Sequence, residues 1–333
     1  MSALERRSPA TEARSARSRP YVVGFLLPPE FVLLSYAAAL EPLRAANTLS
    51  GKTLYVWKRI TVGGGPVTAL TGGTFEADYA VGDDFIPDLV LVCCPSDSTR
   101  FRDEAVFAWL RQIERKGGAV GGISGGVFIL ARAGLLEGYR SSVAWPRISA
   151  FREEFPEHPV TESLFVFDGN RITCGGGLSS SDMMHALIKA HHGHELADAV
   201  SEWFLQTQIR TDRDPQRMSL RYRLGVSNGT VIKAISHMEQ SLEQPLSIAE
   251  LAKLTGTSVR QLQRLFKTHM NASIATIYRD LRLAGAQKLL QQTTNSITEI
   301  GISAGFTSLA HFSHAFRTKY GYPPSLERMP RPD

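Results

Sequence analysis

The chain has 333 residues, 43% of them hydrophobic, three cysteines and a formal net charge of +5. That length predicts about two domains, and the apolar content is ample for packed cores. No apolar run approaches the roughly 20 residues that a membrane-spanning helix needs. The cysteines, two of them adjacent (Cys93 and Cys94), have neither a disulfide-framework nor a zinc-ligand spacing. These features predict a cytoplasmic protein that holds no metal or cofactor and does not enter a membrane.

Residues 1–20 are rich in Arg, Ser and Ala and contain almost no large apolar side chains. A segment of this composition cannot bury enough apolar surface to order itself, so we expect a disordered tail. An Arg- and Ser-rich, acid-poor start is also typical of an organellar transit peptide, which is the alternative interpretation.

From residue 21 to residue 209, strand-like and helix-like patterns alternate. Strands are expected at 21–29, 56–62, 89–94 and 119–123, a β-hairpin at 164–173, and helices at 31–47, 103–116, 124–136, 179–192 and 196–208. Alternating units of this kind predict an α/β fold, a Rossmann-like parallel sheet sandwiched by helices. The polar residues 210–225 are expected to form a linker. We expect Cys93 and Cys94 to be buried structural thiols, with redox sensing as the alternative.

The strand at 119–123 runs into a helix through Gly122-Ile123-Ser124-Gly125-Gly126, which satisfies the G-x-S-x-G pattern of a serine-hydrolase nucleophile elbow. A catalytic Ser124 would also need a general base and an orienting acid. The candidate bases show no spacing that marks one of them for this role; they are His158, His185, His191, His192 and His194. A serine hydrolase or amidase that uses Ser124 is therefore one hypothesis for this chain.

Residues 226–328 are predicted to form an all-helical domain that carries the positive charge. From Met218 onward the chain has 14 Lys and Arg against 7 Asp and Glu, whereas the preceding residues have 23 against 25. Attraction to phosphates supplies most of the non-specific affinity of proteins for DNA. The asymmetry favours a DNA-binding role for this domain.

Two similar units lie in this domain, from Ser247 to Met270 and from Ser296 to Gly321. Each has a short helix, a turn around a glycine (Gly256 or Gly305) and a serine that starts a second helix. This is the pattern of a helix-turn-helix motif, whose second helix lies in a DNA major groove. Two copies joined by a helix at 273–292 predict a domain that contacts two successive grooves of double-stranded DNA.

The second helix of each motif is expected to contact DNA through its polar face. In the first motif these residues are Ser258, Arg260, Gln261, Gln263, Arg264 and Lys267, opposite an apolar face of Val259, Leu262, Leu265 and Phe266. In the second motif they are Ala310, His311, His314 and Arg317, opposite Phe312 and Phe316. Arg pairs well with guanine and Gln with adenine, so the first helix is expected to supply more of the specificity. The alternative is that both polar faces are only solvated surfaces.

The C-terminal domain resembles the AraC-type DNA-binding domain. The matching segments are 248–252, 278–290, the Gly305–Phe306 pair and 311–325. Asn271 and Ile274 stand where that family favours Gly and Pro, and Gly301 replaces a usual helical Ala at a cost of about 1 kcal/mol.

The N-terminal domain resembles the PfpI-like domain, a relative of the class I glutamine amidotransferases. In catalytic relatives the elbow residue is Cys, and a His precedes a Trp further along the chain. Here the corresponding residues are Ser124 and Ala144, which precedes Trp145, while Glu41 corresponds to the acidic residue beside the nucleophile. The resemblance implies a domain that binds a ligand without catalysing a reaction.

A PfpI-like domain followed by an AraC-type domain is the layout of the GlxA-type transcriptional regulators. Segments 41–47, 121–126 and 201–217 look most like the branch that regulates catabolism of glycine betaine, carnitine and related quaternary amines. The resemblance implies a homodimeric activator that binds DNA, RNA polymerase and a small-molecule effector.

A zwitterionic quaternary amine would suit four residues of the N-terminal domain: Glu41, Ser124, Gly125 and Trp145. The N-terminus of the helix after Ser124 would attract a carboxylate, the indole of Trp145 would attract a quaternary ammonium, and Glu41 would add a counter-charge. Alternatively, the elbow only preserves a turn and Trp145 belongs to the core. The rival functions are the hydrolase, a non-specific DNA binder, and a regulator whose first domain binds no ligand.

Overall fold

The computed structural model describes residues 19–95, 98 and 101–328. The chain divides into two compact units between Gln216 and Arg217, within the segment expected to be a linker. The expected tail, residues 1–20, lies almost wholly outside the described residues. None of the helices in the described ranges is both long enough and apolar enough to cross a bilayer.

The first unit is built on a seven-stranded sheet with the order β10-β11-β7-β6-β1-β2-β5. These strands are β1 (Tyr21–Leu26), β2 (Tyr55–Thr61), β5 (Tyr79–Ala80), β6 (Leu89–Cys94), β7 (Ala119–Ser124), β10 (Phe165–Asp168) and β11 (Arg171–Cys174). All neighbours pair in parallel except β10 and β11, which form the predicted antiparallel hairpin at one edge. The predicted α/β fold is confirmed.

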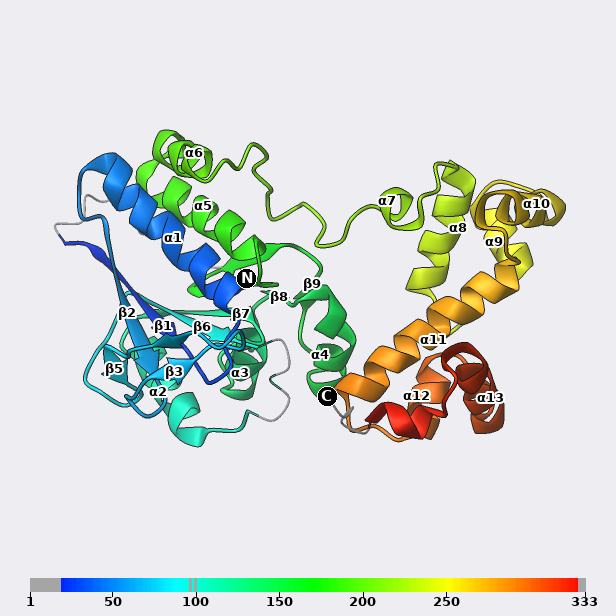
Figure 1. Cartoon of the computed structure of the whole chain (residues 1–333), viewed down its shortest axis with the longest axis horizontal. Helices are drawn as coiled ribbons and strands as arrows, with labels where there is room; N and C mark the ends of the chain where they lie inside the picture. The colour runs from blue at the N-terminus through cyan, green and yellow to red at the C-terminus, as the bar shows by residue number, and fades with distance from the viewer. Residues whose placement is uncertain (1–18, 96–97, 99–100, 329–333) are drawn as a thin grey trace, which may run out of the picture. The chain divides into compact units, whose positions relative to one another are not determined.

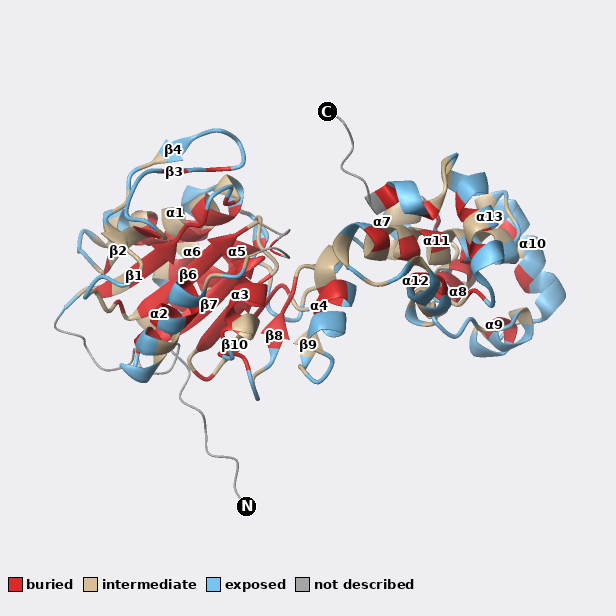
Figure 2. Ribbon diagram, turned by 90° about the horizontal axis from the view of Figure 1, so that it is seen from below, coloured by how far each residue is buried: buried red, intermediate tan, exposed pale blue. Residues whose placement is uncertain are grey.

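Helices cover both faces of this sheet (Figure 1). One face carries α1 (Leu33–Ser50), α5 (Ser179–His192) and α6 (His194–Trp203), and the other carries α2 (Glu104–Arg115), α3 (Gly126–Arg132) and α4 (Ile148–Glu154). Strand β6 packs against both layers, because successive side chains of a strand point to opposite faces. Its continuous apolar sequence is typical of a parallel strand buried on both sides, and Figure 2 shows β6 and β7 buried in the middle of the sheet.

The vicinal cysteines of β6 belong to different cores. Cys93 packs in the core beneath α1 and α5, and Cys94 packs in the core beneath α2 and α3. Burial raises the pKa of the Cys93 thiol and that of Cys174, which keeps both thiols protonated and poorly reactive. These features favour the structural interpretation of the cysteines.

Several short elements of the first unit were not predicted. They are β3 (Val67–Thr68), β4 (Thr74–Phe75), β5, β8 (Ser141–Ser142), β9 (Val160–Thr161), the 3₁₀ helix η2 (Trp145–Arg147) and α4. Strands of two residues show no periodicity that a sequence could reveal. The last helix was predicted too long: α6 ends at Trp203, and Leu205 takes a positive φ of 56°, which is incompatible with a continuing helix.

The second unit is all-helical. Its elements are α7 (Leu220–Leu224), α8 (Gly229–Gln240), α9 (Ile248–Leu254), α10 (Val259–Met270), α11 (Ile274–Gln292), α12 (Ile297–Ser303), α13 (Leu309–Tyr320) and the 3₁₀ helix η3 (Pro324–Arg328). The long helix α11 joins two separate cores (Figure 1): its first half packs with α8, α9 and α10, and its second half packs with α12 and α13. The predicted pair of helix-turn-helix motifs is confirmed.

Candidate nucleic-acid interface and effector cavity

Both helix-turn-helix motifs begin with the same hydrogen-bonded cap. The Ser247 hydroxyl accepts a hydrogen bond from the Glu250 N–H at 3.2 Å, and the Glu250 carboxylate accepts one from the Ser247 N–H at 2.7 Å. Ser296 and Glu299 repeat the arrangement at 3.1 and 2.7 Å. Such a capping box satisfies N–H groups that the first turn leaves unpaired, and it fixes where each first helix starts.

The second helices, α10 and α13, repeat the same anchoring pattern. Their caps, Ser258 and Ser308, each accept a hydrogen bond from the N–H three residues later at 3.2 Å. The next turns bury Leu262 and Phe266 in α10, and Phe312 and Phe316 in α13, all with no exposed surface. The pattern places a polar face outward on each helix.

Every residue predicted to contact DNA is exposed: Ser258, Arg260, Gln261, Gln263, Arg264 and Lys267 on α10, and Ala310, His311, His314 and Arg317 on α13. Val259 was assigned to the apolar face, but its side chain is 39% exposed, and its counterpart Leu309 is 44% exposed. Both occupy the first position of a recognition helix, ahead of the buried turn. An apolar side chain there can contact a thymine methyl group.

Helix α11 fixes the position of both motifs. The Tyr278 hydroxyl donates to the Ser241 carbonyl at 2.7 Å and accepts from the Leu246 N–H at 3.0 Å, which holds the segment before α9. One turn later, the Arg282 guanidinium donates to the carbonyls of residues 304 and 305 at 2.7 and 2.5 Å. It also lies 4.2 Å from the centre of the Phe306 ring. The turn between α12 and α13 is therefore held by a helix that also holds the other motif.

In the first unit, β7 joins α3 through a strained turn. Ser124 has a φ of +56°, which is uncommon for a residue with a side chain. A Cβ atom added to Gly125 would lie 1.7 Å from the Pro95 carbonyl oxygen, and one added to Gly126 would lie 2.0 Å from that of Val92. The two glycines are therefore required by backbone packing, and the turn has the shape of a nucleophile elbow.

A cavity of about 480 Å³ opens above Ser124, and we refer to it as the elbow cavity. Its polar and aromatic lining includes Ser35, Ser124, Trp145, Arg210 and Gln216, and Leu178 and residues 175–177 are also part of the wall. Trp145 is 38% exposed. Among the described residues that line the cavity, none is a histidine and none carries a carboxylate.

Comparisons with known proteins match both units. The family model for the helix-turn-helix domain matches residues 251–328, and that for the DJ-1/PfpI family matches residues 31–190. The chain is 39% identical to the HTH-type transcriptional regulator CdhR of Pseudomonas aeruginosa over 308 residues, which cover 92% of this chain and 91% of that protein. The HTH-type transcriptional regulator GlxA of Rhizobium meliloti is also 39% identical, with 92% and 95% covered. The chain belongs to this family of GlxA-type transcriptional regulators.

A solved structure of an AraC family transcriptional regulator from Pseudomonas putida is similar to this GlxA-type regulator over 56% of the chain and 100% of its own length. The two are 25% identical, with a TM-score of 0.52. The family assignment agrees with the fold, because the sheet is mostly parallel and flanked by helices, and a helical domain with two helix-turn-helix motifs follows it.

The elbow of this regulator lacks the surroundings that a hydrolase needs. The Gly125 N–H, which would stabilise an oxyanion in a hydrolase, donates instead to the Cys94 carbonyl at 3.3 Å. Three of the candidate bases have partners away from Ser124: His158 contacts Ser141, His185 contacts Ser201, and His191 contacts Tyr55. These contacts do not favour the hydrolase hypothesis.

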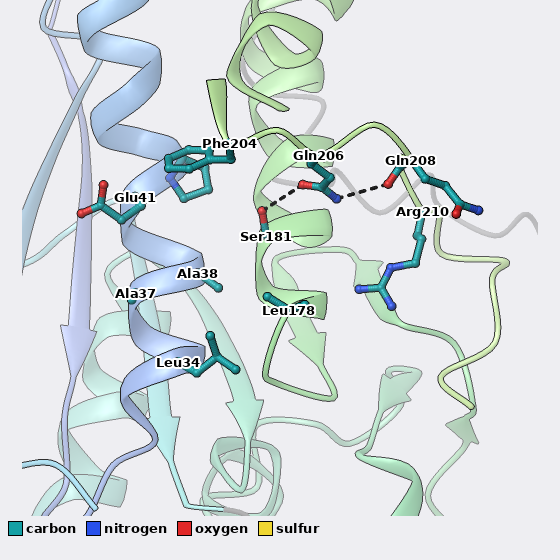
Figure 3. A pocket seen from close by; sticks show the side chains of 11 residues that line it. Leu34, Ala37, Ala38, Glu41, Leu178, Ser181, Phe204, Gln206, Gln208 and Arg210 are labelled. Carbon is teal, nitrogen blue, oxygen red and sulfur yellow. Dashed lines mark hydrogen bonds between the residues drawn. The ribbon is translucent and has the colours of Figure 1, made fainter. Parts of the chain in front are cut away.

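Of the four predicted effector residues, the structure brings Ser124 and Trp145 to one cavity, whereas Gly125 follows Ser124 in the chain but is not part of the cavity lining. Glu41 lies elsewhere, on a groove of about 520 Å³ between α1 and α5, which Figure 3 shows. Its carboxylate forms an ion pair with Arg44 at 2.6 Å and points away from Arg210. The structure therefore does not bring Glu41 together with Ser124 and Trp145.

Among the residues of the elbow cavity that sequence reasoning missed, Arg210 and Gln216 have the longest polar side chains. The Gln216 amide nitrogen donates to the carbonyls of Val143 and Ser163 at 2.9 and 2.8 Å, and its oxygen accepts from the Trp145 N–H at 2.7 Å. Both residues come from the polar stretch that was expected to be a linker. Their hydrogen-bond partners lie far away in the sequence, so the local composition could not reveal the two residues.

Proposed function

We propose that this GlxA-type regulator binds a small zwitterionic quaternary amine, such as glycine betaine or carnitine, in the elbow cavity and catalyses no reaction there. The observation that carries the proposal is a cavity that keeps the elbow turn while its described lining contains no histidine and no carboxylate. A strained turn costs stability, so its presence without a general base favours binding over catalysis.

Trp145 supports the choice of a quaternary amine. Its indole forms part of the cavity wall and is 38% exposed. The face of an indole attracts an alkylammonium group through its quadrupole, and this attraction increases when the site excludes water. No carboxylate among the described lining residues neutralises the cation, so the aromatic face is expected to be its main partner.

For the second unit, we propose that α10 and α13 occupy two successive major grooves, about 34 Å apart along the duplex. The exposed face of α10 carries Arg and Gln side chains suited to base edges, and that of α13 carries smaller and less specific ones. We further propose that the protein acts in the cytoplasm as a homodimer, occupies two such half-sites and activates transcription by RNA polymerase.

Trp145 provides a direct test of effector binding, because all four tryptophans lie in the first unit. Titration of the purified protein with glycine betaine or carnitine is expected to change tryptophan fluorescence and raise the melting temperature. Trp145→Phe should retain part of the affinity, whereas Trp145→Ala should lose about tenfold or more, in keeping with a desolvated cation–π contact. Unchanged affinity in Trp145→Ala would show that the cation binds elsewhere.

DNA recognition can be tested with sheared genomic DNA. At physiological salt, sequencing of the bound fraction should recover a few sharp sites, and in vitro transcription from one of them should increase when effector is added. Diffuse recovery without preferred sites would contradict sequence-specific binding.

The absence of catalysis is tested separately with an ester or amide probe. Hydrolysis of the probe that is lost in Ser124→Ala would contradict the proposed absence of catalysis.

A further inference from the structure

Arg210 holds a fully buried carboxylate. Asp182, on α5, has no exposed surface. Its two oxygens accept hydrogen bonds from the Arg210 Nη2 at 2.5 Å and the Gln206 Nε2 at 3.0 Å. Both donors come from the segment between α6 and residue 216, and a buried charge is stable only when it is paired in this way. This segment is thus held to the first unit by an internal ion pair.

Arg210 also lines the elbow cavity. Among the described residues that line this cavity, it is the only one with a charged side chain. A guanidinium carries five N–H donors, and Asp182 accepts from one of its terminal nitrogens. In Figure 3 the guanidinium points back toward Leu178, and Leu178 borders both the elbow cavity and the groove between α1 and α5. Arg210 is therefore placed to meet a ligand in the elbow cavity.

We propose that Arg210 binds the carboxylate of the effector, an inference that rests on the proposed binding of a zwitterion in the elbow cavity. Arg is the side chain best suited to a carboxylate, because its planar fork matches the two oxygens. The helix N-terminus after Ser124 is a poorer candidate, since α3 has only seven residues and the Gly125 N–H already donates to Cys94. With Trp145 on the cation and Arg210 on the carboxylate, the cavity meets both ends of the ligand.

This assignment explains how an occupied cavity affects the rest of the chain. Arg210 and Gln216 line the cavity, and both belong to the segment that directly precedes the second unit at Arg217. A ligand carboxylate on Arg210 competes with Asp182 for the guanidinium. Binding therefore changes how the connecting segment is held, and a ligand acts on a regulator through such differential contacts.

Three probes of similar size test the two ends of the ligand one at a time. Glycine betaine has both charges, choline lacks the carboxylate, and the tert-butylacetate anion (3,3-dimethylbutanoate) lacks the cation. Removing Arg210 alone would leave the buried Asp182 carboxylate without its partner. The comparison is therefore made in an Asp182→Asn background, where removal of Arg210 leaves no buried charge unpaired. We expect Asp182→Asn to bind glycine betaine at least as tightly as the wild type. Adding Arg210→Gln should weaken glycine betaine and tert-butylacetate about tenfold to a hundredfold, but choline less than about twofold.

Arg44→Gln is the matched control, because Arg44 lies on α1, pairs with Glu41 and does not line the elbow cavity. It should leave all three affinities unchanged. Equal losses for glycine betaine and choline in the double variant would assign Arg210 a structural role and overturn the inference while leaving the proposed function intact. If the wild-type protein binds neither these three probes nor carnitine, the proposed function is wrong, and the inference that rests on it is wrong as well.

Discussion

The two helix-turn-helix motifs share one framework and differ in the surface that they present. Their caps, their buried pairs and their C-terminal turns match at a constant spacing of 50 positions: 258 and 308, 262 and 312, 266 and 316, 271 and 321. The exposed positions do not match in chemistry. Where α10 has Arg260, Gln261 and Arg264, α13 has Ala310, His311 and His314.

The difference indicates that the folding of such a motif and its recognition of DNA depend on separate sets of residues. Both motifs keep the buried positions because each helix must be anchored to its own core. The exposed positions can change because they contribute little to folding. We therefore expect substitutions at buried positions to act on stability in one motif at a time, and substitutions at exposed positions to act on DNA alone.

The largest effect is expected from the buried phenylalanines. Phe266→Ala and Phe316→Ala should each cost about 3–5 kcal/mol of stability, since each leaves a cavity in a packed core. Because the two cores are separate, hydrogen exchange followed by mass spectrometry should show faster exchange in α8–α10 for the first variant and in α12–α13 for the second. Equal acceleration in both motifs would mean that the domain unfolds as one unit.

A smaller effect is expected from the matched exposed pair Arg264 and His314. Arg264→Ala should weaken binding to a preferred site by about 1–3 kcal/mol and relax the preference at one base pair. His314→Ala should cost less than about 1 kcal/mol, because His makes weaker and less selective base contacts. Fluorescence anisotropy with the operator and its single-base variants measures both, with the exposed Lys253→Ala on α9 as control. Equal losses of affinity in Arg264→Ala and His314→Ala would contradict the proposal that α10 supplies more of the sequence specificity than α13.

Most of the fold could be predicted from the sequence, because its elements are long and periodic. The pattern of β6 and the serine caps before α10 and α13 were enough to place those elements. The family preference for Gly at position 271 now has a reason: Asn271 takes a φ of +50° at the end of α10, a conformation that glycine adopts more easily. Gly301 is explained as well, since a Cβ there would lie 3.1 Å from the Phe312 ring.

The proposed effector site was harder to predict than the proposed DNA interface. Contact residues on a recognition helix follow from helical spacing alone, whereas the elbow cavity combines β7, the segment at 144–146, residues 175–177 and Arg210. Glu41 was included on the basis of resemblance, but α1 presents it to a different groove, paired with Arg44. Arg210 was overlooked because its role depends on the buried Asp182, 28 positions earlier in the chain.

A still smaller loss of DNA affinity is expected from substitution of Lys267 or Arg317, and the loss should be the same for both. The two residues occupy the same position in α10 and α13. Both are exposed cations suited to phosphates, so Lys267→Ala and Arg317→Ala should weaken binding to all sequences alike. Each should reduce the slope of log affinity against log salt by about 1, through the loss of one phosphate contact. The measurement is a salt series on operator and non-operator DNA, and an effect confined to the operator would indicate base contact instead.

The smallest effect is expected at the ends of the two recognition helices. Asn271 and Gly321 both follow their helix in the left-handed region, with φ of +50° and +85°. Glycine adopts this region at no steric cost, so Asn271→Gly should stabilise the first motif by about 0.5–1 kcal/mol, and Gly321→Asn should destabilise the second by a similar amount. Exchange of the last-turn amides of α10 and α13 is the measurement. Asn271→Gly also removes the 3.4 Å hydrogen bond from the Lys267 ammonium to the Asn271 side chain, and Lys267→Ala is the control because it removes the same hydrogen bond while keeping Asn271. If Asn271→Gly instead destabilises the first motif, that side-chain contact outweighs the backbone preference, and the two helix ends are not equivalent.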